Sequence, residues 1–134
     1  MISKEIDFEN IEWKQTPYKG IFVSPIDKEE DPTNPKIPKL TAHAVRIDPD
    51  CEIGFHYHDR EKGWAEFIIL PKGGNVEVGD TVNQESFQNT NPVYVRVNSK
   101  ETYRIKNRDS RKPVFLISIM KPGFTEYEEI KNNL

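Results

Sequence analysis

Cysteine and histidine are both scarce in this sequence of 134 residues, which contains one cysteine and three histidines. Because Cys51 has no second cysteine to pair with, an intrachain disulfide is excluded. Residues 1–7 also lack the uninterrupted apolar stretch of a secretory signal. We therefore expect a cytoplasmic protein.

Long hydrophobic runs and an excess of positive charge are absent as well. The longest apolar runs, residues 67–70 and the serine-interrupted residues 114–120, fall far below the ~20 residues that a membrane helix needs. The net charge of −3 supplies no basic field for a polyphosphate backbone. We expect neither a membrane nor a nucleic acid as partner. The length corresponds to one domain.

Helical periodicity is rare, because ten prolines interrupt almost every window in which apolar residues could recur every three to four positions. Short alternating segments recur instead, which is typical of an antiparallel sandwich or barrel. The expected strands are residues 18–24, 40–48, 52–58, 64–70, 75–82, 86–88, 93–97, 103–107 and 114–120. Residues 27–39 predict a solvated, proline-rich loop, and residues 124–134 a short terminal helix. The predicted fold class is all-β.

Histidines and a carboxylate coincide on faces that are expected to point inward. Two residues separated by one position on a strand project from the same face, about 6–7 Å apart, so both can reach one ion. His56 and His58 have this spacing, and Glu66 shares the inward face of the next strand. We call these three residues the two-His-one-Glu set. Such sets suit non-haem iron, zinc, manganese and nickel, although a His-x-His pair also occurs by chance.

The same residues resemble the first motif of the cupins, small double-stranded β-helix barrels with the pattern G-x5-HxH-x3,4-E-x6-G. The two-His-one-Glu set and Gly73 stand at the motif positions, whereas Asp50 stands in place of the first glycine. Seven residues rather than three or four separate His58 from Glu66, which a longer hairpin would accommodate. Glu61 is a rival carboxylate, but it lies in a polar turn.

The second cupin motif, G-x5-PxG-x2-H-x3-N, is matched more weakly. Asn107 keeps the last position, and Tyr103 stands where the motif has its last metal-binding histidine. The resemblance spans residues 40–120 and implies a single cupin or jelly-roll barrel within residues 1–134. Residues 1–39 would add N-terminal strands and the proline-rich acidic loop. The resemblance also implies a homodimer.

The resemblance leaves three functions open. In the first, the two-His-one-Glu set binds Fe, Mn, Zn or Ni, and the protein acts on a small polar molecule as an oxygenase or isomerase. His43 and Trp64 would line that pocket. In the second, no metal is present, and His56 or His58 as base and Tyr103 as acid isomerise or epimerise a nucleotide-linked sugar. In the third, the barrel binds a small ligand without catalysis.

Overall fold

The computed structural model describes residues 1–30, 39–71, 74–88 and 91–124. These residues form ten strands and no helix, so the all-β prediction is confirmed, and no helix in these ranges could span a membrane. The strands are β1 (Lys14–Gln15), β2 (Ile21–Glu29), β3 (Lys39–Ile47), β4 (Glu52–His56), β5 (Ala65–Leu70), β6 (Asn75–Gly79), β7 (Gln84–Gln88), β8 (Val93–Asn98), β9 (Tyr103–Asn107) and β10 (Val114–Phe124).

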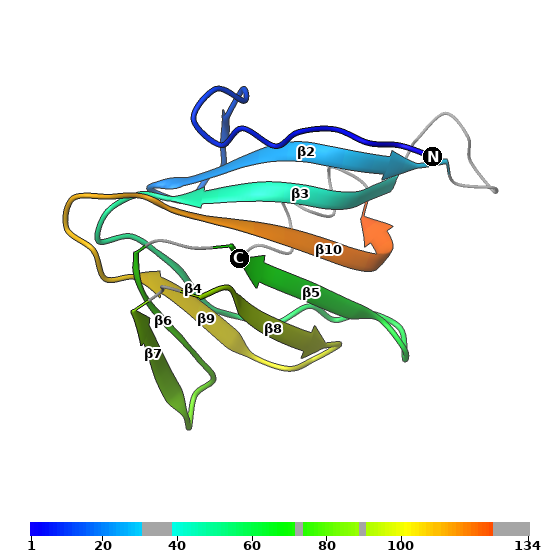
Figure 1. The fold of residues 1–134 in the computed structure, drawn as a ribbon. Coiled ribbons are helices and arrows are strands. Elements are labelled where there is room, and N and C mark those ends of the chain that lie inside the picture. The colour runs from blue at the N-terminus through cyan, green and yellow to red at the C-terminus, as the bar shows by residue number, and fades with distance from the viewer. Residues whose placement is uncertain (31–38, 72–73, 89–90, 125–134) are drawn as a thin grey trace.

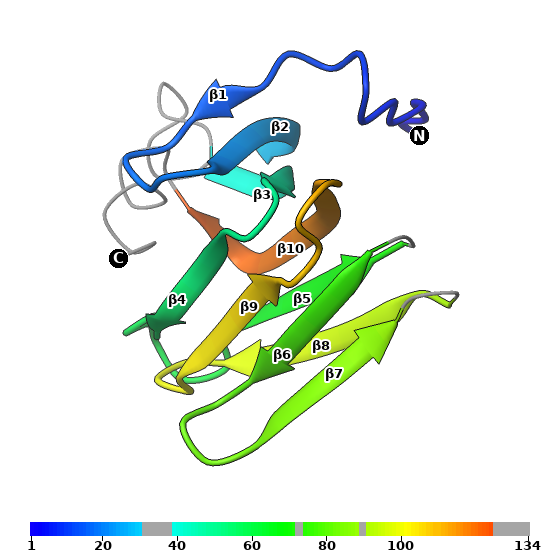
Figure 2. The same cartoon turned by 90° about the vertical axis from the view of Figure 1, so that its left-hand side faces the viewer.

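The strands form two antiparallel sheets, with the orders β1-β2-β3-β10-β5-β8 and β4-β9-β6-β7. From β3 to β10 the chain changes sheet at every step except between β6 and β7, which pair as a hairpin. This winding is that of a jelly-roll barrel. Figure 1 shows β2, β3 and β10 side by side, and Figure 2 shows the second sheet facing the first.

The period of two selects the residues that fill the barrel. In β3, His43, Val45 and Ile47 are buried, whereas Arg46 lies on the outer face, 3.9 Å from the centre of the Phe22 ring. Aliphatic side chains from both sheets complete the main core, which comprises Ile21, Val45, Ile47, Ile68, Leu70, Val76, Val78, Val97, Tyr103, Ile105, Val114 and Leu116. A smaller cluster contains Leu40, Trp64 and Met120.

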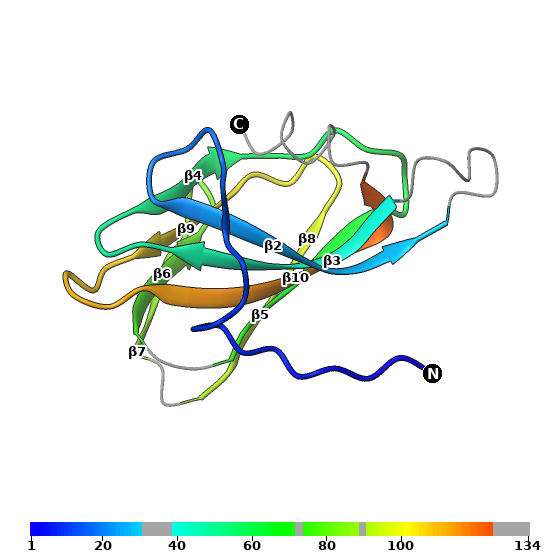
Figure 3. The same ribbon diagram turned by 90° about the horizontal axis from the view of Figure 1, so that it is seen from above.

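The N-terminal segment crosses the outer face of the larger sheet (Figure 3). The rings of Phe8 and Trp13 stack on Phe115 of β10, with centroid distances of 5.0 and 5.9 Å. Arg46 of β3 lies 5.5 Å from the Trp13 ring. This segment therefore covers apolar surface of its own sheet.

Two strands extend past prolines that were expected to end them. β2 runs through Pro25, and β10 runs through Pro122, with register shifts against β3 after Pro25 and after Ile119. A proline cannot donate to the ladder, so it is tolerated where the pairing is irregular. Residues 27–29 thus belong to a strand, which corrects the loop predicted for residues 27–39. The helix predicted for residues 124–134 lies, apart from its first residue, outside the described residues.

Asn107 is fully buried and holds the corner between the sheets together. Its side-chain N–H groups donate to the carbonyl oxygens of Ile47 at 3.0 Å, Asp48 at 3.2 Å and Lys112 at 2.9 Å. Its Oδ1 atom accepts from the backbone N–H of Asp109 at 2.9 Å. The residue that keeps the second cupin motif therefore joins the end of β3 to the loop between β9 and β10.

We expect Asn107→Ala to lower the free energy of unfolding by about 3 kcal/mol, because it leaves several buried backbone groups without their partner. Urea denaturation measures the change. Asn98→Ala is the matched control, since the Asn98 side chain is exposed, and should change the value by less than about 0.5 kcal/mol. A cost below about 1 kcal/mol for Asn107→Ala would contradict the structural role of this amide.

Candidate functional site

A buried carboxylate, Glu66 of β5, lies at the centre of the barrel with 5% of its surface exposed. Its Oε1 atom accepts a hydrogen bond of 2.6 Å from the Tyr103 hydroxyl of β9. Its Oε2 atom accepts one from the Ser118 hydroxyl of β10. Because β9 belongs to one sheet and β5 and β10 to the other, the Tyr103 bond connects the two walls of the barrel, whereas the Ser118 bond lies within one sheet.

A cavity of about 130 Å³ opens beside this carboxylate. Its walls are aliphatic side chains from both sheets. Its polar lining consists of Tyr18, His43, Glu52, Glu66, Tyr103 and Ser118. His43 on β3 and Tyr103 on β9 contribute to the lining from opposite sheets.

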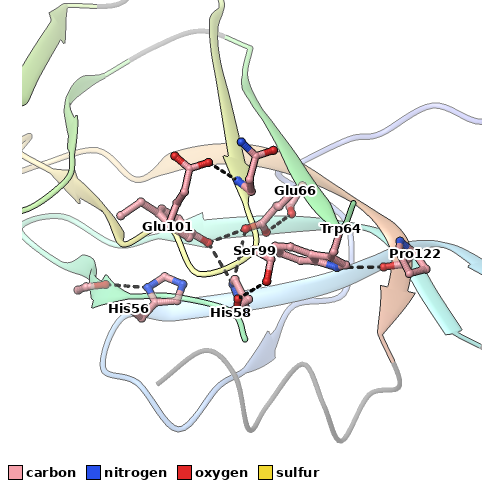
Figure 4. Close-up of polar contacts among 11 residues, drawn as sticks. His56, His58, Trp64, Glu66, Ser99, Glu101 and Pro122 are labelled. Carbon is pink, nitrogen blue, oxygen red and sulfur yellow. Dashed lines mark hydrogen bonds and ion pairs between the residues drawn. The ribbon is translucent and has the colours of Figure 1, made fainter. Parts of the chain in front are cut away.

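The predicted histidine pair lies beside this cavity, outside its lining. His56 and His58 are both buried, with ring centroids 5.1 Å apart in an edge-to-face arrangement. The His56 ring packs against the Tyr103 ring at 4.3 Å. The Nε2 atom of His58 lies 3.5 Å from the Tyr103 hydroxyl and 3.7 Å from Oε1 of Glu66. Figure 4 shows the two histidines and Glu66 in this region.

Comparison with solved structures identifies the architecture. A predicted oxalate decarboxylase from Thermotoga maritima matches with a TM-score of 0.62 at 14% identity, over 87% of this chain and 97% of its own. An RmlC-like cupin from Shewanella frigidimarina matches with a TM-score of 0.60 at 14% identity, over 88% and 90%. The Schizosaccharomyces pombe Cnp3 cupin domain matches with a TM-score of 0.59 at 19% identity, over 95% and 77%. The chain has the cupin fold.

No protein-family model and no curated protein matches the sequence of this chain. The fold explains one departure from the first cupin motif. Asp50 has a φ of 58°, in the left-handed region that glycine adopts without strain and aspartate tolerates better than most residues. Gly73, the last motif residue, lies outside the described residues. The fold itself does not specify an activity.

Burial favours the neutral form of all three histidines. Burial lowers the pKa of His43 to about 4, partly opposed by the charge of Glu66. Burial, aided by His56, Arg60 and His43, lowers the pKa of His58 to about 3. Burial also lowers the pKa of His56. The Nδ1 atom of His56 lies 2.8 Å from the carbonyl oxygen of Gly54, so Nδ1 carries the proton and Nε2 holds the lone pair.

The two-His-one-Glu set is brought together, but it is not arranged as a metal centre. Metal ligands must all point lone pairs at one ion about 2.0–2.2 Å away. Here the Tyr103 hydroxyl donates to Oε1 of Glu66 and lies 3.5 Å from Nε2 of His58, and the other carboxylate oxygen accepts from Ser118. In the part of the chain that the structure describes, no group of three or more His, Cys, Asp or Glu residues is placed to hold a metal. The residues therefore do not fit a metal in this arrangement.

The other predicted site residues lie at separate places in the structure. His43 lines the cavity. Trp64 is buried but is not part of the cavity lining. Its indole N–H donates to the Pro122 carbonyl oxygen at 3.1 Å, and its ring packs against His58 (Figure 4). Glu61, the rival carboxylate, has a side chain that is 60% exposed and lies 3.9 Å from Arg60.

Two polar residues of the site escaped the sequence interpretation. Ser118 interrupts the apolar run of residues 114–120 on the inward face, so this polar residue between Leu116 and Met120 was an available signal. Tyr18 precedes β2, and only the folded chain brings it to the cavity. Its hydroxyl is buried and has no hydrogen-bond partner among the described residues.

We expect acid to destabilise this protein, in part because His43 is protonated when the chain unfolds. Unfolding restores the ordinary pKa of 6.5, so between pH 6.5 and 4 the unfolded chain binds the proton that folded His43 excludes. The corresponding contribution to the free energy of unfolding is fully present above pH 6.5. About 2 kcal/mol of this free energy is lost at pH 5. Urea denaturation at pH 7.5 and pH 5 measures the loss.

In His43→Gln the loss of stability between pH 7.5 and pH 5 should shrink by about 2 kcal/mol, because glutamine does not titrate. The comparison concerns the difference between the two pH values, so a general destabilisation of the variant does not affect it. An unchanged difference would contradict the buried, neutral state of His43.

Proposed function

We propose that this cupin binds a small molecule in the barrel cavity, with the Glu66 carboxylate as its main hydrogen-bond acceptor. The observation that supports this most is the fixed position of Glu66 at the cavity wall. The Tyr103 and Ser118 hydroxyls each donate to one carboxylate oxygen and hold it in place. A carboxylate oxygen has two lone pairs, so it can accept more than one hydrogen bond.

The size of the cavity limits the ligand. A protein cavity of about 150 Å³ accommodates benzene, so 130 Å³ suits a body of about six non-hydrogen atoms. A nucleotide-linked sugar is far larger. The described residues that line the cavity also include no lysine or arginine to hold a diphosphate. Arg104 lies 3.3 Å from Glu52 and 3.6 Å from Glu77 instead.

The placement of acid and base also favours the ligand-binding proposal over the sugar-isomerase alternative. That alternative needs a base and an acid on opposing walls of one cavity. Tyr103 lines the cavity, but His56 and His58 do not. His43 and Tyr103 do line it from opposite sheets, which supports proton transfer as the chemistry to test if a bound ligand is turned over.

We expect small fragments to bind in this cavity and Glu66→Gln to weaken the binding at least tenfold, since the variant keeps the shape but removes the charge. A library of amines, alcohols and carboxylates with up to eight non-hydrogen atoms, followed by NMR chemical shifts, tests this. The shifts should centre on Glu66 and Ser118. Glu61→Gln is the matched control, because Glu61 is exposed, and should leave the affinity unchanged. Shifts that centre elsewhere would argue against the cavity as the site.

Metal binding by the two-His-one-Glu set is the competing proposal, and it makes Tyr103 decisive. Purified without metal-chelating resin, the protein should contain far less than one Fe, Mn, Zn or Ni per chain. Tyr103→His removes the hydroxyl that engages Glu66 and adds a third imidazole, so it should raise zinc binding toward one ion per chain. Elemental analysis and zinc titration measure both.

His58→Ala in the Tyr103→His background is the control, and it should abolish the added zinc site. A stoichiometric metal in the unaltered protein that is lost in His56→Ala and His58→Ala would establish the competing proposal instead.

The homodimer and the cytoplasmic location remain predictions. The N-terminal segment packs through Phe8 and Trp13 on its own sheet. Light scattering on the purified chain gives the oligomeric state directly.

A further inference from the structure

The groups that line the cavity carry one sign of charge. The two carboxylates, Glu52 and Glu66, are the formally charged side chains among the described lining residues. Glu52 lies at the edge of the smaller sheet, 3.3 Å from Arg104, whereas Glu66 lies inside the barrel. His43, the histidine of the lining, is neutral because burial lowers its pKa to about 4. An anionic ligand would therefore approach a carboxylate in a poorly solvated site, which is strongly unfavourable.

The remaining polar groups suit a hydrogen-bond donor. The Tyr103 and Ser118 hydroxyls already donate to Glu66, so their oxygen lone pairs are the groups left to accept. The Tyr18 hydroxyl is buried at the same cavity and has no hydrogen-bond partner among the described residues. Tyrosine rings at the wall add an attraction for positive charge through their faces. The Glu66 carboxylate, the hydroxyl oxygens and the tyrosine rings thus all favour a positively charged hydrogen-bond donor.

The apolar walls define the rest of the ligand. Seven aliphatic side chains line the cavity, among them Val45, Ile68 and Leu116. A polyol or sugar would place hydroxyl groups against these walls without partners, which costs free energy. A short alkyl group would bury apolar surface there instead.

We propose that the ligand of this cavity is a small organic cation, an alkylammonium of about five or six non-hydrogen atoms, whose charged group binds Glu66 and whose alkyl group fills the barrel. This inference rests on the proposed function, because it names the class of molecule that the cavity accepts. Within the barrel, Ser118 and Tyr103 orient the carboxylate, and Tyr18 accepts a second hydrogen bond from the ammonium group.

Three matched probes test the charge preference in the unaltered, full-length protein. Isobutylamine, isobutanol and isobutyrate share one alkyl group and differ in the charge of the polar end at pH 7. Titration followed by NMR chemical shifts should show isobutylamine binding at least tenfold more tightly than isobutanol, with no saturable binding of isobutyrate. Shifts should centre on Glu66 and Ser118.

Two variants and one control variant show which residues produce the preference for the amine. Glu66→Gln should reduce the ratio of amine to alcohol affinity to about one, whereas Glu61→Gln should preserve it. Tyr18→Phe should weaken isobutylamine about threefold and leave isobutanol within twofold. Because the decisive comparison uses the unaltered protein, it stands even if a variant folds poorly.

The outcomes separate this inference from the proposed function. Tighter binding of isobutanol or isobutyrate within the cavity overturns the cationic ligand and leaves the cavity as a binding site. Binding of none of the three probes, or shifts centred away from Glu66, counts against the cavity itself and overturns both. An amine preference that survives Glu66→Gln also overturns the inference, because another group would then recognise the charge.

Discussion

The hydrogen bond from Tyr103 to Glu66 is the interaction on which the arrangement of the barrel interior depends in this protein. A carboxylate buried with 5% exposure is costly unless donors replace its lost water. Tyr103 from one sheet and Ser118 from the other supply these donors. Because the bond spans the two walls of the barrel, it joins the two sheets beside the cavity. It also holds the Glu66 carboxylate in place at the cavity wall.

The same hydrogen bond changes the chemistry that is open to the two-His-one-Glu set. His56, His58 and Glu66 occupy positions that resemble a metal set, and the fold brings them close together. A phenol in place of a further imidazole donates a hydrogen bond to the carboxylate, whereas an imidazole would offer a lone pair to an ion. One side chain therefore directs Glu66 toward hydrogen bonding. The similarity of fold to a predicted oxalate decarboxylase or an RmlC-like cupin does not by itself specify an activity.

The strand faces could be read from the sequence because a strand has a side-chain period of two. His56 and His58 are buried and alternate with exposed Phe55 and Tyr57 as this period predicts, but β4 ends at His56, so His58 lies beyond the end of the strand that was predicted to include it. The strand ends could not be read in the same way. Pro25 suggested an end, but register shifts in the pairing with β3 let the strand continue. Such irregularities arise from the fit between strands that are distant in the sequence, which local patterns do not contain.

The sequence by itself determined an all-β chain with inward histidines and an inward carboxylate, since alternation is a local property of consecutive residues. Only the tertiary structure decided which of these groups meet. It placed His43 and Glu66 at the cavity and excluded His56 and His58 from its lining, and it brought Tyr18 into the site. The reason is geometric: alternation gives the face on which a side chain lies, whereas its neighbours depend on how two sheets pack across the barrel.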